Sequence, residues 1–213
     1  MDFLPPDIEK YVREHTSSES DLLYRLNRET HQKVLKPRML SGHLQGRFLS
    51  MISKMMQPQR ILEIGTYTGY SALCLAEGLQ QNGELHTIDV NEELKDFAQK
   101  FFDESAQKNQ IHYHIGNAMD IIPTLNGPFD IVFIDADKEN YLEYFQLVFD
   151  KVKQGGYLIA DNVLWSGKVV GEVKPNDSDT KKIMAFNDFV QNNPAVENVL
   201  LPLRDGLMIA RKL

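Results

Sequence analysis

The sequence predicts an α/β fold, a mostly parallel sheet of seven strands that is doubly wound and carries helices on both faces. Short apolar runs alternate with helical patterns from residue 60 to residue 193, and such alternation is typical of parallel sheets covered on both sides. Two further apolar runs within residues 198–213 have only a short loop between them, which predicts a C-terminal antiparallel hairpin. We expect a single domain over residues 1–213, with residues 1–58 as a helical N-terminal extension within it.

The N-terminal extension is expected to hold three helices. The first two are predicted over residues 7–16 and 20–35, and Ser20 is a suitable N-cap because its hydroxyl can accept a bond from a free N–H of the first turn. The third is predicted over residues 44–56 and is closed by Pro58, because proline is not tolerated inside a helix.

Strands and helices then alternate along the rest of the chain. The runs that predict the first five strands are RILEIG, ELHTIDV, IHYHIG, FDIVFIDA and GYLIAD. Helical patterns follow these strands at 70–79, 91–107, 140–152 and 181–193, with one short helix after the third strand. The loop of the terminal hairpin contains Asp205 and Gly206, a pair that is typical of tight turns and that brings the predicted strands to seven.

Composition and charge exclude several classes of protein. Hydrophobic residues make up 42% and charged residues 25%, which is typical of a globular protein. The net charge of −7 disfavours a broad basic surface, and with it bulk binding to nucleic acid or to an anionic membrane. The N-terminus lacks the pattern of a signal peptide, and no apolar run approaches the roughly 18 residues that span a bilayer. We therefore expect a cytoplasmic protein with no membrane partner.

The end of the first strand is a candidate binding site for a nucleoside cofactor. Gly65 and Gly69 lie where the strand turns into a helix, so the backbone can approach a ligand closely. Tyr67 stands where a dinucleotide fingerprint would have its second glycine, which disfavours pyrophosphate recognition. Asp89 closes the second strand at a spacing suited to the hydroxyls of a ribose, or else it is a solvated strand end. Glu63 could hold a cationic amino group, which favours S-adenosylmethionine as the ligand.

The fourth and fifth strands both end in polar residues that suit a hard divalent cation. Asp135 follows the fourth strand, and Asp161 and Asn162 follow the fifth. Because neighbouring parallel strands end at one edge of the sheet, these side chains would offer three oxygen ligands and leave room for water and substrate. Mg²⁺ is the first choice, with Ca²⁺ or Mn²⁺ as alternatives.

Lys138 would lie beside a substrate bound to such a cation. Burial and a neighbouring cation favour the neutral amine, which could accept a proton from a hydroxyl group. The alternative is that the cluster after the fourth strand is only a helix cap with solvated charges. Trp165 could form a wall of an aromatic substrate pocket or could belong to the core. His112 and His114 lie on one face of the third strand, where we expect partly exposed residues rather than a metal site.

Taken in order, EIGTYTGYS, IDV, GNAMD, FIDADKENY, DNVLWSG and LPLRDGLMIARK resemble successive motifs of the cation-dependent class I O-methyltransferases of the caffeoyl-coenzyme A type. Catechol O-methyltransferases are more distant relatives of that family. The resemblance covers the chain from about residue 39 to residue 213 and points to a bacterial member. It implies a Rossmann-like sheet with an antiparallel last strand, S-adenosylmethionine as methyl donor, a divalent cation, and usually a homodimer.

The resemblance also implies roles for individual residues. Asp135, Asp161 and Asn162 match the metal ligands, and Lys138 matches the general base. Asp135, Trp165 and Ser166 would face the substrate. The donor would be bound by a set in which Asp89 holds the ribose, Ala118 lies near the adenine and Asp137 touches donor or substrate. This set comprises Ser41, Glu63, Gly65, Thr66, Ser71, Asp89, Ala118 and Asp137.

The leading functional hypothesis is a Mg²⁺-dependent transfer of a methyl group to a hydroxyl of a catechol-like small molecule. Both oxygens of such an acceptor would chelate the cation, and one would be methylated. A transfer-RNA hydroxyuridine O-methyltransferase is the alternative enzyme, against which the acidic net charge counts mildly. A non-catalytic nucleotide-binding module is the alternative of another class.

Overall fold

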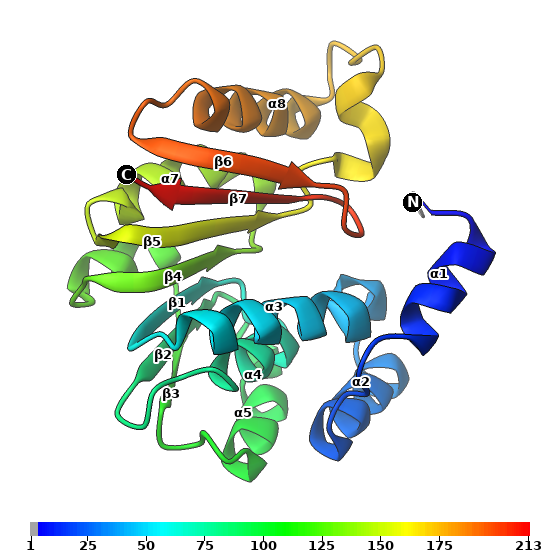
Figure 1. Ribbon diagram of the computed structural model, residues 1–213, viewed down its shortest axis with the longest axis vertical. Coiled ribbons are helices and arrows are strands. Elements are labelled where there is room, and N and C mark those ends of the chain that lie inside the picture. Colours follow the sequence, from blue (N-terminus) through cyan, green and yellow to red (C-terminus); the bar gives the residue numbers. More distant parts are fainter. Residues whose placement is uncertain (1–3) are drawn as a thin grey trace.

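The structure is a computed structural model that describes residues 4–213. The predicted N-terminal extension starts at residue 1, so its first three residues lie outside the described part. Seven strands form one sheet in the order β3-β2-β1-β4-β5-β7-β6 (Figure 1). Their bounds are β1 Arg60–Ile64, β2 Glu84–Asp89, β3 Ile111–Ile115, β4 Phe129–Ile134, β5 Val152–Asp161, β6 Val196–Leu201 and β7 Leu207–Lys212.

The sheet is doubly wound, as predicted. From β1 the chain proceeds outward to β2 and β3, then returns to place β4 on the other side of β1, so that strand order reverses between β1 and β4. Strands β1 to β5 pair in parallel, whereas β7 is antiparallel to both β5 and β6. The predicted hairpin is therefore present, and its second strand lies inside the sheet, between β5 and β6.

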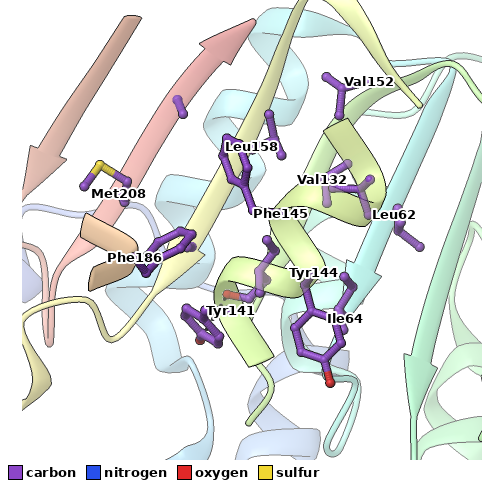
Figure 2. Packing of buried hydrophobic residues seen from close by; sticks show 14 of the residues in the cluster. Leu62, Ile64, Val132, Tyr141, Tyr144, Phe145, Val152, Leu158, Phe186 and Met208 are labelled. Carbon is purple, nitrogen blue, oxygen red and sulfur yellow. Dashed lines mark hydrogen bonds between the residues drawn. The ribbon is translucent and has the colours of Figure 1, made fainter. Parts of the chain in front are cut away.

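Helices cover both faces of the sheet because successive strand residues point to opposite sides. On one face, Ile61 and Phe133 pack against α3, α4 and α5. On the other face, Leu62 and Val132 pack in a cluster with α7 and α8, in which the rings of Phe145 and Phe186 lie 6.0 Å apart (Figure 2). The helices are α1 Pro6–Glu14, α2 Asp21–Lys33, α3 Gly42–Met56, α4 Tyr70–Ala76, α5 Lys95–Glu104, α6 Ala118–Ile121, α7 Tyr141–Phe149 and α8 Ser178–Gln191.

The three N-terminal helices differ in how they join the domain. Helix α3 packs against α4, and α2 buries Leu23 and Leu26 in the same core. Ser20 is the N-cap of α2, as predicted, and its hydroxyl oxygen accepts a bond from the N–H of Leu23 at 3.3 Å. Helix α1 buries none of its residues and stands apart from the sheet (Figure 1). The extension is therefore integrated into the core from α2 onward.

Candidate active site

A cleft of about 2090 Å³ opens at the carboxyl ends of the parallel strands. The predicted residues at the ends of four strands line it, as do residues of the N-terminal segment and of the loop between β6 and β7. Residues of the predicted sites that line the cleft are Ser41, Gly65, Asp89, Ala118, Asp135, Asp137, Lys138, Asp161, Asn162, Trp165 and Ser166. The remaining three, Glu63, Thr66 and Ser71, are buried behind the turn that follows β1.

The turn after β1 requires glycine at its first position. Gly65 has a φ of +103°, and a Cβ atom there would lie 2.0 Å from the carbonyl oxygen of Asp135. The backbone is held on both sides, because the N–H of Gly65 donates to Ile88 and the N–H of Asp135 donates to Ile64. The absence of a side chain thus lets the turn after β1 lie directly against the turn after β4.

Asp89 is fixed at the end of β2 by two backbone N–H groups. Its Oδ2 accepts from Tyr67 at 2.6 Å, and its Oδ1 accepts from Asn91 at 2.8 Å. Each carboxylate oxygen has a further lone pair, so the side chain can still accept bonds from ligand hydroxyl groups. Just after β3, the neighbouring strand, the N–H of Gly116 donates to the carbonyl oxygen of Asp89, and the buried Ala118 at the start of α6 also lines the cleft.

Glu63 is fully buried beneath the turn after β1. Its Oε2 accepts a bond from the hydroxyl of Thr87 at 2.5 Å, and Thr87 also pairs with the hydroxyl of Thr66. Its Oε1 has no hydrogen-bond partner within residues 4–213. Burial raises the pKa of Glu63 to about 8, an effect that the neighbouring hydroxyl groups of Ser71 and Thr87 only partly oppose. The carboxyl group is therefore largely protonated at neutral pH.

Asp135 and Asp161 leave neighbouring strands at the same level, because Ile134 of β4 pairs with Ala160 of β5. Asp161 is only 2% exposed. Burial, and next the negative charge of Asp135, raise the pKa of Asp161 above the usual range of a carboxyl group. The next residue, Asn162, has a φ of +59° and lines the cleft beside the two carboxylates.

These three side chains suit a divalent cation. A cation would replace the repulsion between the two carboxylates with attraction, and all three side chains offer the oxygen ligands that Mg²⁺ prefers. Across the described part of the chain, no group of three His, Cys, Asp or Glu side chains is arranged to hold a metal. The predicted set contains only two such side chains, because its third member, Asn162, is an amide. The metal site therefore stays a prediction, which the oxygen ligands of these three side chains support.

Lys138 is held directly against Asp135. Its Nζ lies 3.1 Å from Asp135 Oδ1 and donates to the phenol oxygen of Tyr141 at 2.5 Å. The buried Tyr141 in turn donates its hydroxyl proton to the carbonyl oxygen of Asp161 at 3.0 Å. Tyr141, which was not among the predicted site residues, thus links the base candidate to the end of β5.

Asp137 is held by the helix that follows it. Its Oδ1 accepts from the hydroxyl of Tyr144 at 2.6 Å, and its Oδ2 accepts from the side-chain amide of Asn140 at 2.5 Å. Burial is the main cause that raises the pKa of Tyr144 well above its ordinary value, so that the phenol stays protonated. Asp137 therefore keeps a fixed orientation at the mouth of the cleft.

The loop after β5 carries two of the three predicted substrate residues, Trp165 and Ser166. Trp165 and Ser166 both have positive φ, at 47° and 55°, an unusual conformation for residues other than glycine. The N–H of Ser166 donates to Asp205 Oδ1 at 2.5 Å, which ties this loop to the loop between β6 and β7. Trp165 lines the cleft together with Met39 and Leu203, which gives this side of the cleft an apolar wall.

Two further residues of the site were missed by sequence reasoning. Gln45 of α3 is fully buried and donates from Nε2 to Asp161 Oδ2 at 2.8 Å. Arg204, in the loop between β6 and β7, donates to Gln45 Oε1 at 2.9 Å. Nothing in the pattern around either residue marks it as functional, because their partners lie more than a hundred residues away in the chain.

The rim that the N-terminal segment contributes to the cleft is basic. Arg28, Lys36 and Arg38 are exposed there, and none of them forms an ion pair within residues 4–213. This local excess of positive charge contrasts with the net charge of −7.

Within residues 4–213, no helix is long and apolar enough to cross a bilayer.

Comparisons with known proteins agree with this geometry. A family model described as O-methyltransferase matches residues 13–213. The chain is 36% identical over 175 residues to a catechol O-methyltransferase from Niastella koreensis, which covers 78% of this chain and 79% of the relative. It is 33% identical over 183 residues to a caffeoyl-CoA O-methyltransferase from Medicago sativa, which covers 79% of this chain and 73% of the relative.

Solved structures of other O-methyltransferases share the fold over nearly the whole chain. TomG from Streptomyces achromogenes, solved in complex with SAM, is 27% identical with a TM-score of 0.89, covering 97% of this chain and 96% of that one. An O-methyltransferase from Bacillus cereus, solved with SAH, is also 27% identical with a TM-score of 0.89, covering 97% of each chain. The chain therefore belongs to the O-methyltransferase family, as its motifs predicted, and is an S-adenosylmethionine-dependent enzyme of the caffeoyl-CoA and catechol type.

Proposed function

We propose that this protein transfers a methyl group from S-adenosylmethionine to one hydroxyl of a catechol-like, vicinal dihydroxy-aromatic molecule, with a divalent cation bound at the acceptor site. The observation that carries the proposal is the juxtaposition of two strand ends. The turn at Gly65, beside Asp89, lies directly against the strand end that carries Asp135 and Lys138. A methyl donor and a hydroxyl acceptor could therefore meet within one cleft.

The donor would occupy the half of the cleft formed by β1, β2 and β3. Asp89 would accept hydrogen bonds from the ribose hydroxyls, and the small Ala118 would leave room for the adenine. Gly65 would let the backbone approach the amino-acid portion of the donor. Glu63, Thr66 and Ser71 would support that turn from behind, because all three are buried and the side chains of Glu63 and Thr66 both bond to the buried hydroxyl of Thr87.

The acceptor would occupy the half formed by β4, β5 and the loop at Trp165. Asp135, Asp161 and Asn162 would hold the cation, for which Mg²⁺ is the first choice. When bound, a cation of this kind supplies Lewis acidity, which lowers the pKa of a coordinated hydroxyl. Trp165 would pack against the ring of the acceptor, and Ser166 and Asp137 would lie at its edges.

Lys138 would act as the general base. The unprotonated amine would take the hydroxyl proton on Nζ, where Asp135 and Tyr141 hold it in place. The acceptor oxygen would then use its freed electron pair to form the new O–C bond to the methyl group. The S–C bond of the donor breaks, its electrons pass to sulfur, and S-adenosylhomocysteine is released.

The test is a methyl-transfer assay with purified protein, labelled S-adenosylmethionine and Mg²⁺ against catechols, caffeoyl thioesters and hydroxylated tRNA. We expect transfer to catechols that EDTA abolishes and Mg²⁺ restores. Asp161→Asn should remove the activity, whereas Asp188→Asn, a carboxylate of α8 outside the cleft, should retain it. Full activity in the presence of EDTA would contradict the proposed dependence on a metal. Binding of S-adenosylmethionine without methyl transfer to any acceptor would favour a non-catalytic module.

The basic rim supports a second candidate function. Arg28, Lys36 and Arg38 could contact phosphates, so a hydroxyuridine in tRNA is the alternative acceptor. Selective methylation of hydroxylated tRNA in this assay, lost when these three residues are replaced by alanine, would establish the alternative function.

By analogy with the family we also propose a cytoplasmic homodimer, which equilibrium sedimentation of the purified protein would test.

A further inference from the structure

The fully buried amide of Gln45 lies between Arg204 and Asp161. Its Oε1 lies 2.9 Å from Arg204 Nη1, and its Nε2 lies 2.8 Å from Asp161 Oδ2. Three elements that are distant in the chain thus meet through one side chain: α3, the loop between β6 and β7, and the end of β5. Neither Gln45 nor Arg204 belongs to the residues proposed above to bind the donor, the cation or the acceptor.

Arg204 decides which way the amide of Gln45 points. A guanidinium group has five N–H donors and no acceptor, so only the oxygen of the amide can face it. The amide nitrogen must then face Asp161, where it can only donate. With the amide reversed, donor would meet donor at Arg204 and acceptor would meet acceptor at Asp161, at the loss of two buried hydrogen bonds.

Asp161 is consequently fixed at both of its oxygens. Oδ2 accepts from Gln45, and Oδ1 accepts from the backbone N–H of Asn162 at 2.7 Å. One donor on each oxygen fixes the plane of the carboxylate and still leaves a lone pair on each oxygen for a ligand. Arg204 is itself anchored, because its Nη1 also donates to the carbonyl oxygen of Ser41 at the start of α3.

We propose that Gln45, locked in one orientation by Arg204, is a positioning residue that aims the carboxylate of Asp161 at the divalent cation. The inference rests on the proposed function, because it assigns Asp161 as a cation ligand. Partners that orient the ligands of a metal typically change its affinity by about 10- to 100-fold when they are removed. The positive charge of Arg204 also reaches Asp161 directly, but its orienting effect passes through Gln45 and therefore requires the amide.

The experiment measures Mn²⁺ affinity by the electron paramagnetic resonance signal of the free ion, without turnover. Gln45→Met keeps the volume of the side chain but removes its amide, and should weaken Mn²⁺ binding by about 10- to 100-fold. Arg204→Met should weaken Mn²⁺ binding in the native background and should not weaken it in the Gln45→Met background, where only the direct charge effect of Arg204 on Asp161 remains. The matched control is Gln99→Met, whose amide donates to Asp103 on α5 outside the cleft, and it should bind Mn²⁺ normally.

Binding of S-adenosylmethionine, measured by calorimetry, separates positioning from general damage. It should stay within twofold of the native value in every variant. Native Mn²⁺ affinity in Gln45→Met, or equal effects of Arg204→Met in both backgrounds, would overturn the inference. So would a parallel loss of S-adenosylmethionine binding, which would indicate a merely structural role. If Gln45→Met does not fold, Arg204→Met decides alone.

The same titration distinguishes this inference from the proposed function. A native protein that does not bind Mn²⁺ would overturn the metal site and the positioning role together. A native protein that binds Mn²⁺ while Gln45→Met binds it equally well would overturn the positioning role and leave the proposed function standing.

Discussion

Gly65 and Asp135 are in such close contact that a methyl group on Gly65 would lie 2.0 Å from the Asp135 carbonyl oxygen. The two residues follow neighbouring parallel strands, and each donates its N–H across the junction between β2, β1 and β4. The contact joins the proposed donor half of the cleft to the proposed acceptor half. In the proposed function, its geometry would set how near the methyl group of the donor and the hydroxyl of the acceptor can come.

Gly65→Ala is expected to destabilise the protein strongly. The new Cβ would overlap backbone atoms that cannot move aside, in addition to the strain of a positive φ. Gly42→Ala is the matched control, because Gly42 has a φ of +73° but no atom within 4 Å of the position that a new Cβ would take. Urea unfolding should show a loss of roughly 1 kcal/mol for Gly42→Ala and of about 2 kcal/mol or more beyond that for Gly65→Ala. Equal losses would show that backbone strain alone requires the glycine.

Replacing Lys138 with methionine is expected to lower kcat by roughly 10²- to 10⁴-fold, the usual contribution of a general base. Lys138→Arg should not restore the rate, because it returns the positive charge but not a basic amine. Lys168→Met, an exposed lysine on the rim of the same cleft, is the control and should retain native kcat. Single-turnover methyl transfer measures the step directly. Native rates in Lys138→Met would show that another group removes the proton.

Asp89→Asn is expected to weaken binding of S-adenosylmethionine by roughly 10- to 100-fold, since hydrogen bonds to a charged acceptor contribute about 1.5–3 kcal/mol. The amide offers one acceptor oxygen in place of two, and Tyr67 and Asn91 already donate to both. Calorimetric titration of S-adenosylmethionine checks the prediction. Asp96→Asn, an exposed carboxylate in the first turn of α5, should bind the donor normally. A native affinity in Asp89→Asn would remove Asp89 from the donor site.

Glu63 is expected to make the protein less stable as pH rises. Its pKa is about 8 in the folded state against 4.5 for the free group, so between these values the folded state binds more protons than the unfolded state. The free energy of unfolding should therefore fall from about pH 5 to pH 8, by at most ~1.4 kcal/mol per pH unit for one proton.

Glu63→Gln keeps the shape of the side chain and removes the titration. Urea unfolding of both proteins at about pH 5, pH 6.5 and pH 8 should show that the native protein loses stability relative to the variant as pH increases. Other titrating groups are common to the two proteins and cancel in the difference. A difference that is constant with pH would mean that Glu63 is ionised throughout the range.

Local patterns predicted most of the fold because each strand and helix carries its own periodicity. The strand ends were equally accessible to reasoning, since parallel strands end at one edge and thus bring Asp135 and Asp161 together. The helix predicted to reach residue 79 ends at Ala76, because exact ends depend on local packing that periodicity does not record.

What the sequence could not predict depends on contacts between distant segments. Gln45 has the pattern of an ordinary polar position in an amphipathic helix, and only the fold places Arg204 and Asp161 beside it.

The histidine pair of β3 shows the same limit of sequence patterns. His112 and His114 are partly exposed, as predicted, but a third ring, His86 of β2, stacks on His112 with centroids 4.9 Å apart. Register between strands, which no local pattern encodes, creates that trio.

The position of β7 between β5 and β6 also constrains the order in which the chain can assemble during synthesis. Among the described residues, β6 pairs with β7 alone, although the ribosome makes β6 first. Until β7 emerges, β6 has no partner and β5 presents an unpaired edge on which a strand of another molecule could dock. Chaperone dependence during translation should therefore be concentrated in the interval after β6 has been made and before β7 has been inserted.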